Sequence, residues 1–235
     1  MQLFYNPDIT EETQEIIFNK EESRHIVKVL RKTTDDHLTI TNGNGFLFTA
    51  SIVIPSDKKC LAKIIKVEHR PKTWKYNLHV AIAPTKNIDR LEWFIEKATE
   101  VGIDEITPIL CQNSERKVVK DERLHKIMLS AMKQSLKLNA VKMNPLVKFS
   151  DFINTDHNAD LFVAHCIPSE KKSLKNIERF SSNILVLIGP EGDFSKEEVD
   201  SAIAKGYTAI TLGESRLRTE TAALTAVQHI NFLHI

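Results

Sequence analysis

One stretch near the C-terminus, residues 184–228, constrains the fold of this chain more than any other part. It opens with five uninterrupted apolar residues, Ile184–Ile188, a pattern typical of a strand that is buried on both faces of a sheet. The short turn Gly189–Gly192 follows the strand. Ser195 then precedes Glu198 by three residues, which is the spacing of a capping box and predicts that a helix begins there.

A second strand is predicted at Thr208–Leu212, and it leads into Gly213. A polar loop, residues 214–220, separates this strand from an apolar helix that we expect to run from Thr221 to the C-terminus. Two strand ends therefore each lead into a loop that contains glycine, and open α/β sheets bind their ligands at such ends. The spacing alone is equally compatible with ordinary tight turns, because short glycine loops are weak signals.

Strands and helices alternate through the whole second part of the chain. Strands are predicted at Leu78–Ala83, Ile106–Leu110 and Asp160–Cys166, and helices at Ile88–Val101 and Glu122–Leu138. Such alternation predicts an α/β domain, residues 74–235, with a largely parallel sheet that helices cover.

The N-terminal part is predicted to form a separate β-rich domain, residues 1–70. Strands flank the turn signal Asn42–Gly45, which is typical of a hairpin, and a short helix is expected at Lys20–Leu30. The polar segment His69–Thr73 contains a proline and marks the domain boundary.

Composition limits the function classes. The N-terminal residues lack the basic and apolar regions of a signal peptide, and no apolar run approaches the length of a membrane span. The three cysteines lie far apart, so we expect a protein of the reducing cytoplasm. The net charge is only +1, but residues 112–148 carry nine Lys and Arg against three Asp and Glu. This segment could hold a polyanion through its phosphates, or it could be a solvated helix face.

Motifs of other nucleotide and metal sites are absent from the sequence. There is no G-x-x-x-x-G-K-[ST] phosphate loop and no G-x-G-x-x-G. The histidines His79, His125, His157 and His165 are scattered singly, so we expect no metal site.

Two segments of the C-terminal stretch, GPEGDFSKEE and LGESRLRTETAA, together resemble the paired signature of the RsmE family, the SPOUT-class methyltransferases of uridine N3 in 16S rRNA. Further segments resemble that family in the same order, namely HIVKVLR, DRLEWFIEKATEVGI, SERKVVK and KQS. The resemblance implies a PUA-like barrel before the α/β domain, a deep trefoil knot that includes the C-terminal helix, and a homodimer. It also implies a cytoplasmic enzyme that uses S-adenosylmethionine, needs no metal, and acts on 16S rRNA of the small ribosomal subunit.

The family pattern assigns the cofactor site to the two glycine loops. Glycines let backbone groups at the strand ends approach the cofactor closely, and Leu212 and Leu217 would contact its adenine. The predicted cofactor-binding residues are Ile188, Gly189, Pro190, Glu191, Gly192, Leu212, Gly213, Ser215, Leu217, Arg218 and Thr219.

Uridine N3 carries a proton at neutral pH, so its methylation requires a base, or a cation that stabilises the anion. Arg218 and Glu220 match the family motif L-R-x-E-T-A; we expect Arg218 to orient the uracil and stabilise charge on its oxygens, and Glu220 to be the base. Glu220 could instead clamp Arg218 or favour the helix start through the macrodipole. The predicted RNA-binding residues are Arg24, His25, Arg31, Arg116, Lys117 and Gln134.

The chain departs from the family pattern at three positions. Asp35 stands where a glycine is usual, and Lys133 and Lys137 stand where the family tends to have Glu and Arg. Two alternative functions stay open: the same class of enzyme acting on another rRNA or tRNA nucleotide, and a non-catalytic RNA-binding assembly factor with a vestigial cofactor pocket.

Overall fold

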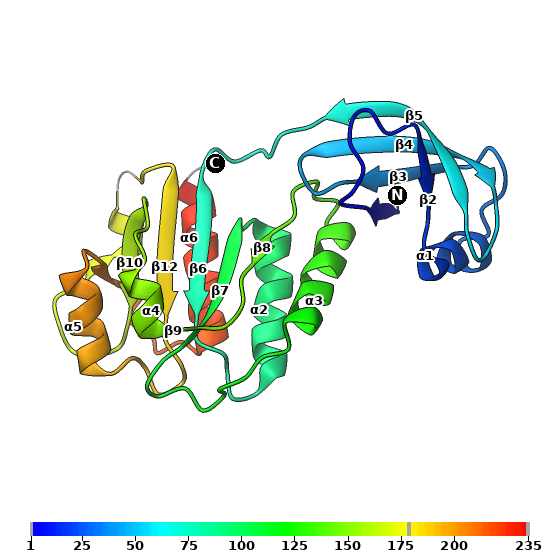
Figure 1. Ribbon diagram of the computed structural model, residues 1–235. Helices are drawn as coiled ribbons and strands as arrows, with labels where there is room; N and C mark the ends of the chain where they lie inside the picture. Colours follow the sequence, from blue (N-terminus) through cyan, green and yellow to red (C-terminus); the bar gives the residue numbers. More distant parts are fainter. Residues whose placement is uncertain (1, 178–179, 234–235) are drawn as a thin grey trace. The chain divides into compact units, whose positions relative to one another are not determined.

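The computed structural model describes residues 2–177 and 180–233, and the chain forms two compact units (Figure 1). The first unit contains residues 1–73 together with Met132–Ala140, and the second contains Trp74–Ala131 and residues 141–235. The break after Thr73 falls at the end of the predicted boundary segment. The segment Met132–Ala140 packs with the first unit although it belongs to the second predicted domain.

The N-terminal unit is built on a mixed five-stranded sheet in the order β1-β3-β4-β5-β2. Its elements are β1 (Leu3–Tyr5), β2 (Glu15–Ile17), α1 (Lys20–Arg24), the π-helical turn η1 (His25–Val29), β3 (His37–Thr41), β4 (Phe46–Ile54) and β5 (Leu61–His69). β1 is parallel to β3, and the other neighbours are antiparallel. Side chains of alternating strand positions, among them Ile40, Phe48 and Ile52, meet Ile26 of η1 in one apolar core, because successive strand residues face opposite sides of the sheet.

The predicted hairpin turn Asn42–Gly45 connects β3 to β4, as expected. Gly43 and Gly45 have φ angles of 81° and 82°, a region that glycine adopts without steric cost. Gly43 also accepts a hydrogen bond from the Ala140 amide (2.8 Å), and a Cβ at Gly43 would lie 2.9 Å from the Cβ of Ala140. The turn therefore needs glycine both for its backbone angles and for the close approach of the segment Met132–Ala140.

Asp35, which stands where the family pattern usually has glycine, adopts a backbone conformation that glycine favours. Its φ is 66°, in the left-handed region that aspartate tolerates better than most residues. The Asp35 amide donates to the Ile52 carbonyl (2.9 Å), and Asp36 accepts from the Thr33 amide (2.7 Å). The turn thus keeps a left-handed residue without glycine.

The C-terminal unit is an α/β layered structure whose strands pair only in parallel within the described residues. Its strands are β6 (Asn77–Ile82), β7 (Glu105–Leu110), β8 (Lys142–Met143), β9 (Val147–Lys148), β10 (Asp160–Ala164), β11 (Lys172–Ser173), β12 (Asn183–Ile188) and β13 (Thr208–Thr211). They follow the order β11-β13-β10-β12-β6-β7-β8, and β9 pairs with β7.

Helices cover both faces of this sheet (Figure 1). They are α2 (Ile88–Val101), α3 (Asp121–Gln134), α4 (Phe149–Asn154), α5 (Lys196–Ala204), α6 (Thr219–Leu233) and the short η2 (Leu174–Asn176). α2, α6 and the first part of α3 pack on one face, and α4 and α5 pack on the other. The predicted α/β architecture is confirmed. No helix in the described part of the chain is long and apolar enough to cross a membrane.

β12, which contains the apolar run Ile184–Ile188, lies in the middle of the sheet, between β10 and β6. Ile184–Ile188 is at most 2% exposed at every position, so the strand is buried on both faces as predicted. The capping box is also present, because the Glu198 amide donates to Ser195 Oγ (3.2 Å) and the Ser195 amide donates to Glu198 Oε2 (2.9 Å). These two bonds satisfy amides at the start of α5 that would otherwise lack a partner.

Two predicted helix ends were wrong. α3 ends at Gln134 and not at Leu138, because Leu136 adopts a left-handed conformation with φ 57° and the Lys137 amide bonds back to the Met132 carbonyl (3.1 Å). α6 begins at Thr219 and not at Thr221, since the Ala222 amide already donates to the Arg218 carbonyl (2.7 Å).

His79 lies in a polar cluster beneath α4. Its Nε2 is 2.7 Å from Thr107 Oγ1, and its ring packs edge-on against Phe152 and 6.4 Å, centre to centre, from His157. Burial lowers the pKa of His79 to about 4, against the opposing effect of nearby Glu105. The folded state therefore favours the neutral imidazole.

We expect this histidine to make folding sensitive to acid. His79 takes up a proton near pH 6.5 in the unfolded chain and only near pH 4 in the folded chain. The free energy of unfolding is therefore unaffected by protonation of this histidine above about pH 6.5 and decreases as the pH falls toward 4. The loss is on the order of 2 to 3 kcal/mol. Urea denaturation between pH 7 and 4.5 should show a smaller pH dependence in His79→Gln than in the parent. The exposed His37 provides the control, because His37→Gln should behave as the parent does; equal pH dependence in all three proteins would contradict the assignment.

Candidate active site at the carboxyl edge of the sheet

The loops that follow β10, β12 and β13 surround a cavity of about 720 Å³. Because parallel strands end at the same edge of a sheet, these loops meet at the position where α/β folds bind ligands. The cavity is lined by Ala164, His165, Cys166, Ile167, Lys171, Ile188, Gly189, Pro190, Glu191, Asp193, Ile210, Thr211, Leu212, Gly213, Glu214, Ser215, Arg216, Leu217, Arg218, Thr219 and Ala222. We refer to it as the first cavity.

All the predicted cofactor-binding residues except Gly192 line the first cavity. A Cβ at Gly192 would lie 3.2 Å from the Asn113 Cβ, and Asn113 Nδ2 donates to the Gly192 carbonyl (3.3 Å). The absence of a side chain at Gly192 therefore leaves room for Asn113 in the loop after β7. A Cβ at Gly189 would similarly lie 3.0 Å from the Phe194 ring, so Gly189 lets Phe194 pack beneath the turn.

Gly213 is different from the other two glycines. Its φ is 142°, and a Cβ there would meet no heavy atom within 4 Å. The backbone at Gly213 therefore borders open space in the wall of the first cavity. A side chain at this position would be strained and would project beside a ligand.

Hydrogen bonds between loops hold the turn after β12 in place. Glu191 Oε1 accepts from the Lys86 amide after β6 (2.9 Å), and Asp193 Oδ2 accepts from the Cys166 amide after β10 (2.7 Å). Carboxylates that accept backbone amides form strong, charge-assisted bonds. These contacts link three strand ends and shape the first cavity.

The segment after β10 was not predicted as part of the site. Ala164–Ile167 and Lys171 line the first cavity, and His165 is only 8% exposed. Burial and the nearby Lys171 lower the pKa of His165. The sequence did predict a strand at Asp160–Cys166, and its carboxyl end could have indicated a binding segment. The segment contains no glycine, however, and for that reason it was not included in the predicted site.

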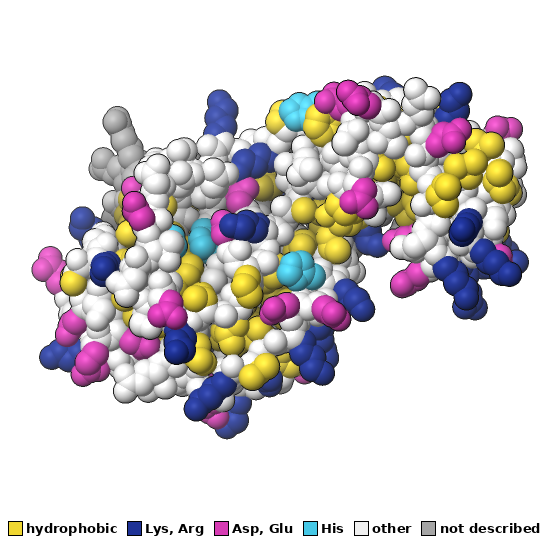
Figure 2. All heavy atoms as spheres, in the orientation of Figure 1, with side chains coloured by type: hydrophobic (Ala, Val, Ile, Leu, Met, Phe, Trp, Pro, Cys, Tyr) yellow, Lys and Arg dark blue, Asp and Glu magenta, His cyan; other side chains and the backbone are white. Residues whose placement is uncertain are grey.

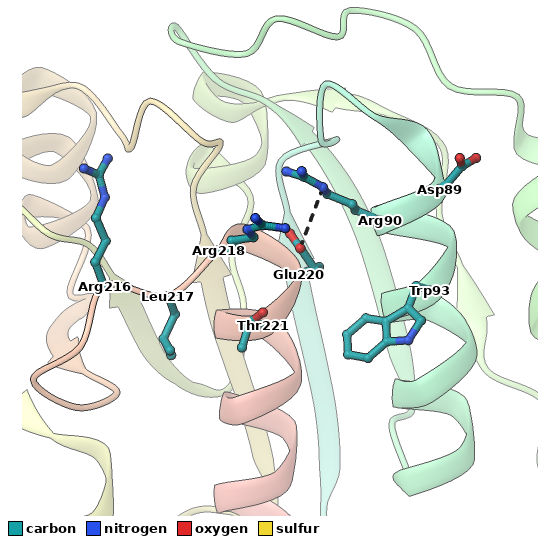
Figure 3. Close-up of a pocket in the computed structure, with 8 residues that line it drawn as sticks. All are labelled: Asp89, Arg90, Trp93, Arg216, Leu217, Arg218, Glu220 and Thr221. Carbon is teal, nitrogen blue, oxygen red and sulfur yellow. Dashed lines mark ion pairs between the residues drawn. The ribbon is translucent and has the colours of Figure 1, made fainter.

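A second cavity, of about 590 Å³, lies between α2 and the start of α6 (Figure 3). It is lined by Asp89, Arg90, Trp93, Arg216, Leu217, Arg218, Glu220 and Thr221. Residues Arg216–Arg218 line both cavities. One loop therefore separates two adjoining binding spaces.

Glu220 lies in the wall of the second cavity, in the first turn of α6, and is 7% exposed. Its Oε1 is 3.9 Å from Arg90 Nε, and its Oε2 is buried without a hydrogen-bond donor among the described residues. The helix macrodipole favours a carboxylate here. Arg218 is exposed and lines both cavities.

The predicted RNA-binding residues of the C-terminal unit differ in their surroundings. Arg116 donates from Nε to the Thr85 carbonyl (3.0 Å) and from Nη2 to the Lys86 carbonyl (2.8 Å), so its guanidinium holds the loop after β6. Lys117 is exposed. The nearby Lys120 is exposed as well.

The other predicted RNA-binding residues belong to the N-terminal unit. Arg24, Arg31 and Gln134 are exposed, and His25 is half-buried against Phe4 and 3.6 Å from Glu22. Figure 2 shows Lys and Arg side chains gathered where α1 lies. Lys133, one of the departures from the family pattern, forms an ion pair with Glu22 (3.3 Å).

The structure brings His79 and His157 together, with ring centres 6.4 Å apart. Among the described residues, no group of three or more His, Cys, Asp and Glu side chains is arranged to hold a metal ion.

Comparison with known proteins identifies relatives over nearly the whole chain. Residues 72–231 match the family model of an RNA methyltransferase domain, and residues 18–65 match that of an RNA methyltransferase PUA domain. The chain is 31% identical to the ribosomal RNA small subunit methyltransferase E of Mesomycoplasma hyopneumoniae, over 84% of this chain and 86% of that protein. The expected PUA-like N-terminal domain is thereby confirmed.

Two solved structures are also similar. A probable rRNA methyltransferase from Porphyromonas gingivalis shares 39% identity and a TM-score of 0.91, covering 100% of this chain and 98% of the other. The ribosomal RNA small subunit methyltransferase E of Neisseria gonorrhoeae, bound to S-adenosylmethionine, shares 26% identity and a TM-score of 0.87, covering 99% and 98%.

Proposed function

The chain belongs to the family of the ribosomal RNA small subunit methyltransferases E, and from this premise we propose that it methylates N3 of a uridine in 16S rRNA with S-adenosylmethionine. The observation that carries the proposal is the pair of adjoining cavities on either side of the loop Arg216–Arg218. A methyl transfer needs donor and acceptor held in line, which is catalysis by proximity and orientation. Two cavities that share one wall provide that arrangement.

The first cavity fits S-adenosylmethionine in size and chemistry. Its volume of about 720 Å³ is within the range of small-molecule sites. Leu212 and Leu217 offer apolar contact to an adenine, and the open space beside Gly213 admits a ligand close to the backbone. Bound S-adenosylmethionine supplies a methyl group on a sulfonium, whose sulfur keeps the bonding electrons when the methyl passes to N3.

Glu220 and Arg218 divide the remaining chemistry between them. Glu220 accepts the proton of N3–H, so the electron pair of that bond stays on the nitrogen and forms the new bond to carbon. Arg218 stabilises the negative charge that develops on the uracil carbonyl oxygens; arginine cannot itself accept the proton. N3 lies on the pairing edge of the base, so the uridine must be unpaired or flipped out.

Exposed cations of both units would hold the rRNA through its phosphates. Lys117 and Lys120 are exposed, whereas the Arg116 guanidinium donates to two backbone carbonyl oxygens. Phosphate contacts release counterions and make affinity depend on salt. We therefore assign electrostatic RNA binding to the lysines and a structural role to Arg116.

Neutralising both lysines, in Lys117→Gln with Lys120→Gln, should weaken rRNA binding and flatten its salt dependence. The slope of log affinity against log salt should fall by about 1.5, because each phosphate contact contributes about 0.7 to 0.9. Affinity for S-adenosylmethionine should stay unchanged. Lys196→Gln on α5, another exposed lysine, serves as the control and should keep the parent slope; an unchanged slope in the double variant would reduce these lysines to a solvated surface.

The same family premise leads us to propose a cytoplasmic homodimer whose chain forms a deep trefoil knot around α6. α6 packs against α2 and contacts η2, so the C-terminal helix lies beside the segment between β10 and β12. Phe232 and Leu233 at its end are 74% and 47% exposed, and a second copy could cover them.

Binding of S-adenosylmethionine separates an enzyme from a non-catalytic assembly factor. Calorimetric titration of the purified protein should give one saturable site per chain. Absence of binding would leave the RNA-binding factor as the better account.

A further inference from the structure

The second cavity contains a carboxylate that lacks a hydrogen-bond donor. Glu220 is 93% buried as a residue, Oε2 accepts no hydrogen bond from the described residues, and Arg90 Nε is 3.9 Å from Oε1, beyond hydrogen-bond distance. A buried charged oxygen without a donor is costly. The arrangement therefore indicates a ligand that donates a hydrogen bond to Glu220.

Two arginines accompany this carboxylate. Figure 3 shows the guanidinium groups of Arg90, from α2, and Arg218, from the loop before α6, beside Glu220, with the ion pair to Arg90 marked. Arginine only donates hydrogen bonds, and an ionised carboxylate only accepts them. The second cavity thus presents a donor, an acceptor and a donor.

Trp93 adds a planar surface to the same cavity. It lies three residues after Arg90 on α2, so both side chains share one face of the helix. Trp93 is 41% exposed. An unpaired base can stack on an exposed indole ring.

The pairing edge of uracil complements this arrangement. It presents O4, N3–H and O2, which are an acceptor, a donor and an acceptor, whereas cytosine presents a donor followed by two acceptors. We propose that the second cavity is the acceptor-base site, in which Trp93 stacks on the uracil and Arg90 helps Glu220 and Arg218 to select uracil over cytosine. The inference rests on the proposed function, and it makes Arg90 and Trp93 residues that determine base specificity.

Nucleotide binding to the protein saturated with S-adenosylhomocysteine tests this proposal, with uridine 5′-monophosphate and cytidine 5′-monophosphate as probes. The uridine nucleotide should quench tryptophan fluorescence with about 5- to 150-fold higher affinity than the cytidine nucleotide, since correct hydrogen-bond pairs discriminate between bases by about 1 to 3 kcal/mol. Trp93→Phe should abolish the quenching, which separates this signal from that of Trp74.

A matched control variant accompanies the test of Arg90. Arg90→Met should bring the two nucleotides within about threefold of each other and slow single-turnover methylation of 16S rRNA by about tenfold, with unchanged affinity for S-adenosylmethionine. Arg123 of α3 forms an ion pair with Glu92, which lies on α2 as Arg90 does. Arg123 itself lies outside the lining of both cavities. Arg123→Met should therefore keep the parent selectivity.

The outcomes separate this inference from the function on which it rests. If the parent protein produces N3-methyluridine but binds both nucleotides equally, or if the quenching survives in Trp93→Phe, the acceptor site lies elsewhere and the proposed function stands. If the parent protein methylates no uridine N3, the proposed function fails and this inference fails with it.

Discussion

Glu220→Gln should slow the methylation of 16S rRNA by about a hundredfold or more at neutral pH, when single turnovers are measured at saturating RNA and S-adenosylmethionine. Glutamine keeps the shape of the side chain but removes its basicity, and general-base catalysis contributes about 10² to 10⁴ in rate. The rate should recover partly as the pH rises, because alkali ionises the uracil without help. Arg218→Ala should also lose about a hundredfold but should not recover, since stabilisation of the oxygen charge is still missing.

A control distinguishes the base from a helix-start residue. Glu197 lies in the first turn of α5 as Glu220 lies in the first turn of α6, and it is exposed and outside the lining of both cavities. Glu197→Gln should keep the parent rate within about threefold. A rate for Glu220→Gln that also stays within about threefold of the parent across the pH range would exclude Glu220 as the base.

Gly213→Val should abolish detectable binding of S-adenosylmethionine while the protein stays folded. A valine there is strained, because φ is 142°, and its side chain would occupy the open space at the wall of the first cavity. Calorimetric titration measures the loss of affinity, and circular dichroism measures the retained fold.

Gly206 offers a closely matched control for this experiment. It also has a positive φ, of 90°, and a Cβ there would meet no heavy atom within 4 Å, but it lies after α5 and outside the lining of the first cavity. Gly206→Val should lower stability to a similar degree and bind S-adenosylmethionine normally. Equal binding in both variants would show that the first cavity is not the cofactor site. Gly189→Val is less informative, because a Cβ there approaches Phe194 and would disturb the fold.

Much of the α/β fold was predictable because its signals are local. The uninterrupted apolar run Ile184–Ile188 is typical of a strand buried on both faces, and the Ser195–Glu198 spacing predicted the start of α5. The end of α3 was not predictable in this way. The left-handed Leu136 precedes a segment that bonds to the hairpin turn Asn42–Gly45, so a tertiary contact overrides the helical pattern.

The candidate site was predictable where the backbone itself is special. Gly213 marked one loop of the first cavity, and Gly189 with Gly192 marked another, although Gly189 makes room for Phe194 and Gly192 makes room for Asn113 of the loop after β7. The second cavity had no such signal. Arg90 and Trp93 occupy the polar side of a helix whose apolar side faces the core, and only the folded chain brings them beside Glu220.

Mass spectrometry of nucleosides from 16S rRNA tests the central claim most directly. Cells that lack this protein should lose N3-methyluridine from their 16S rRNA, the parent protein should restore it, and Glu220→Gln should not. Unchanged N3-methyluridine in cells that lack the protein would contradict the proposed function.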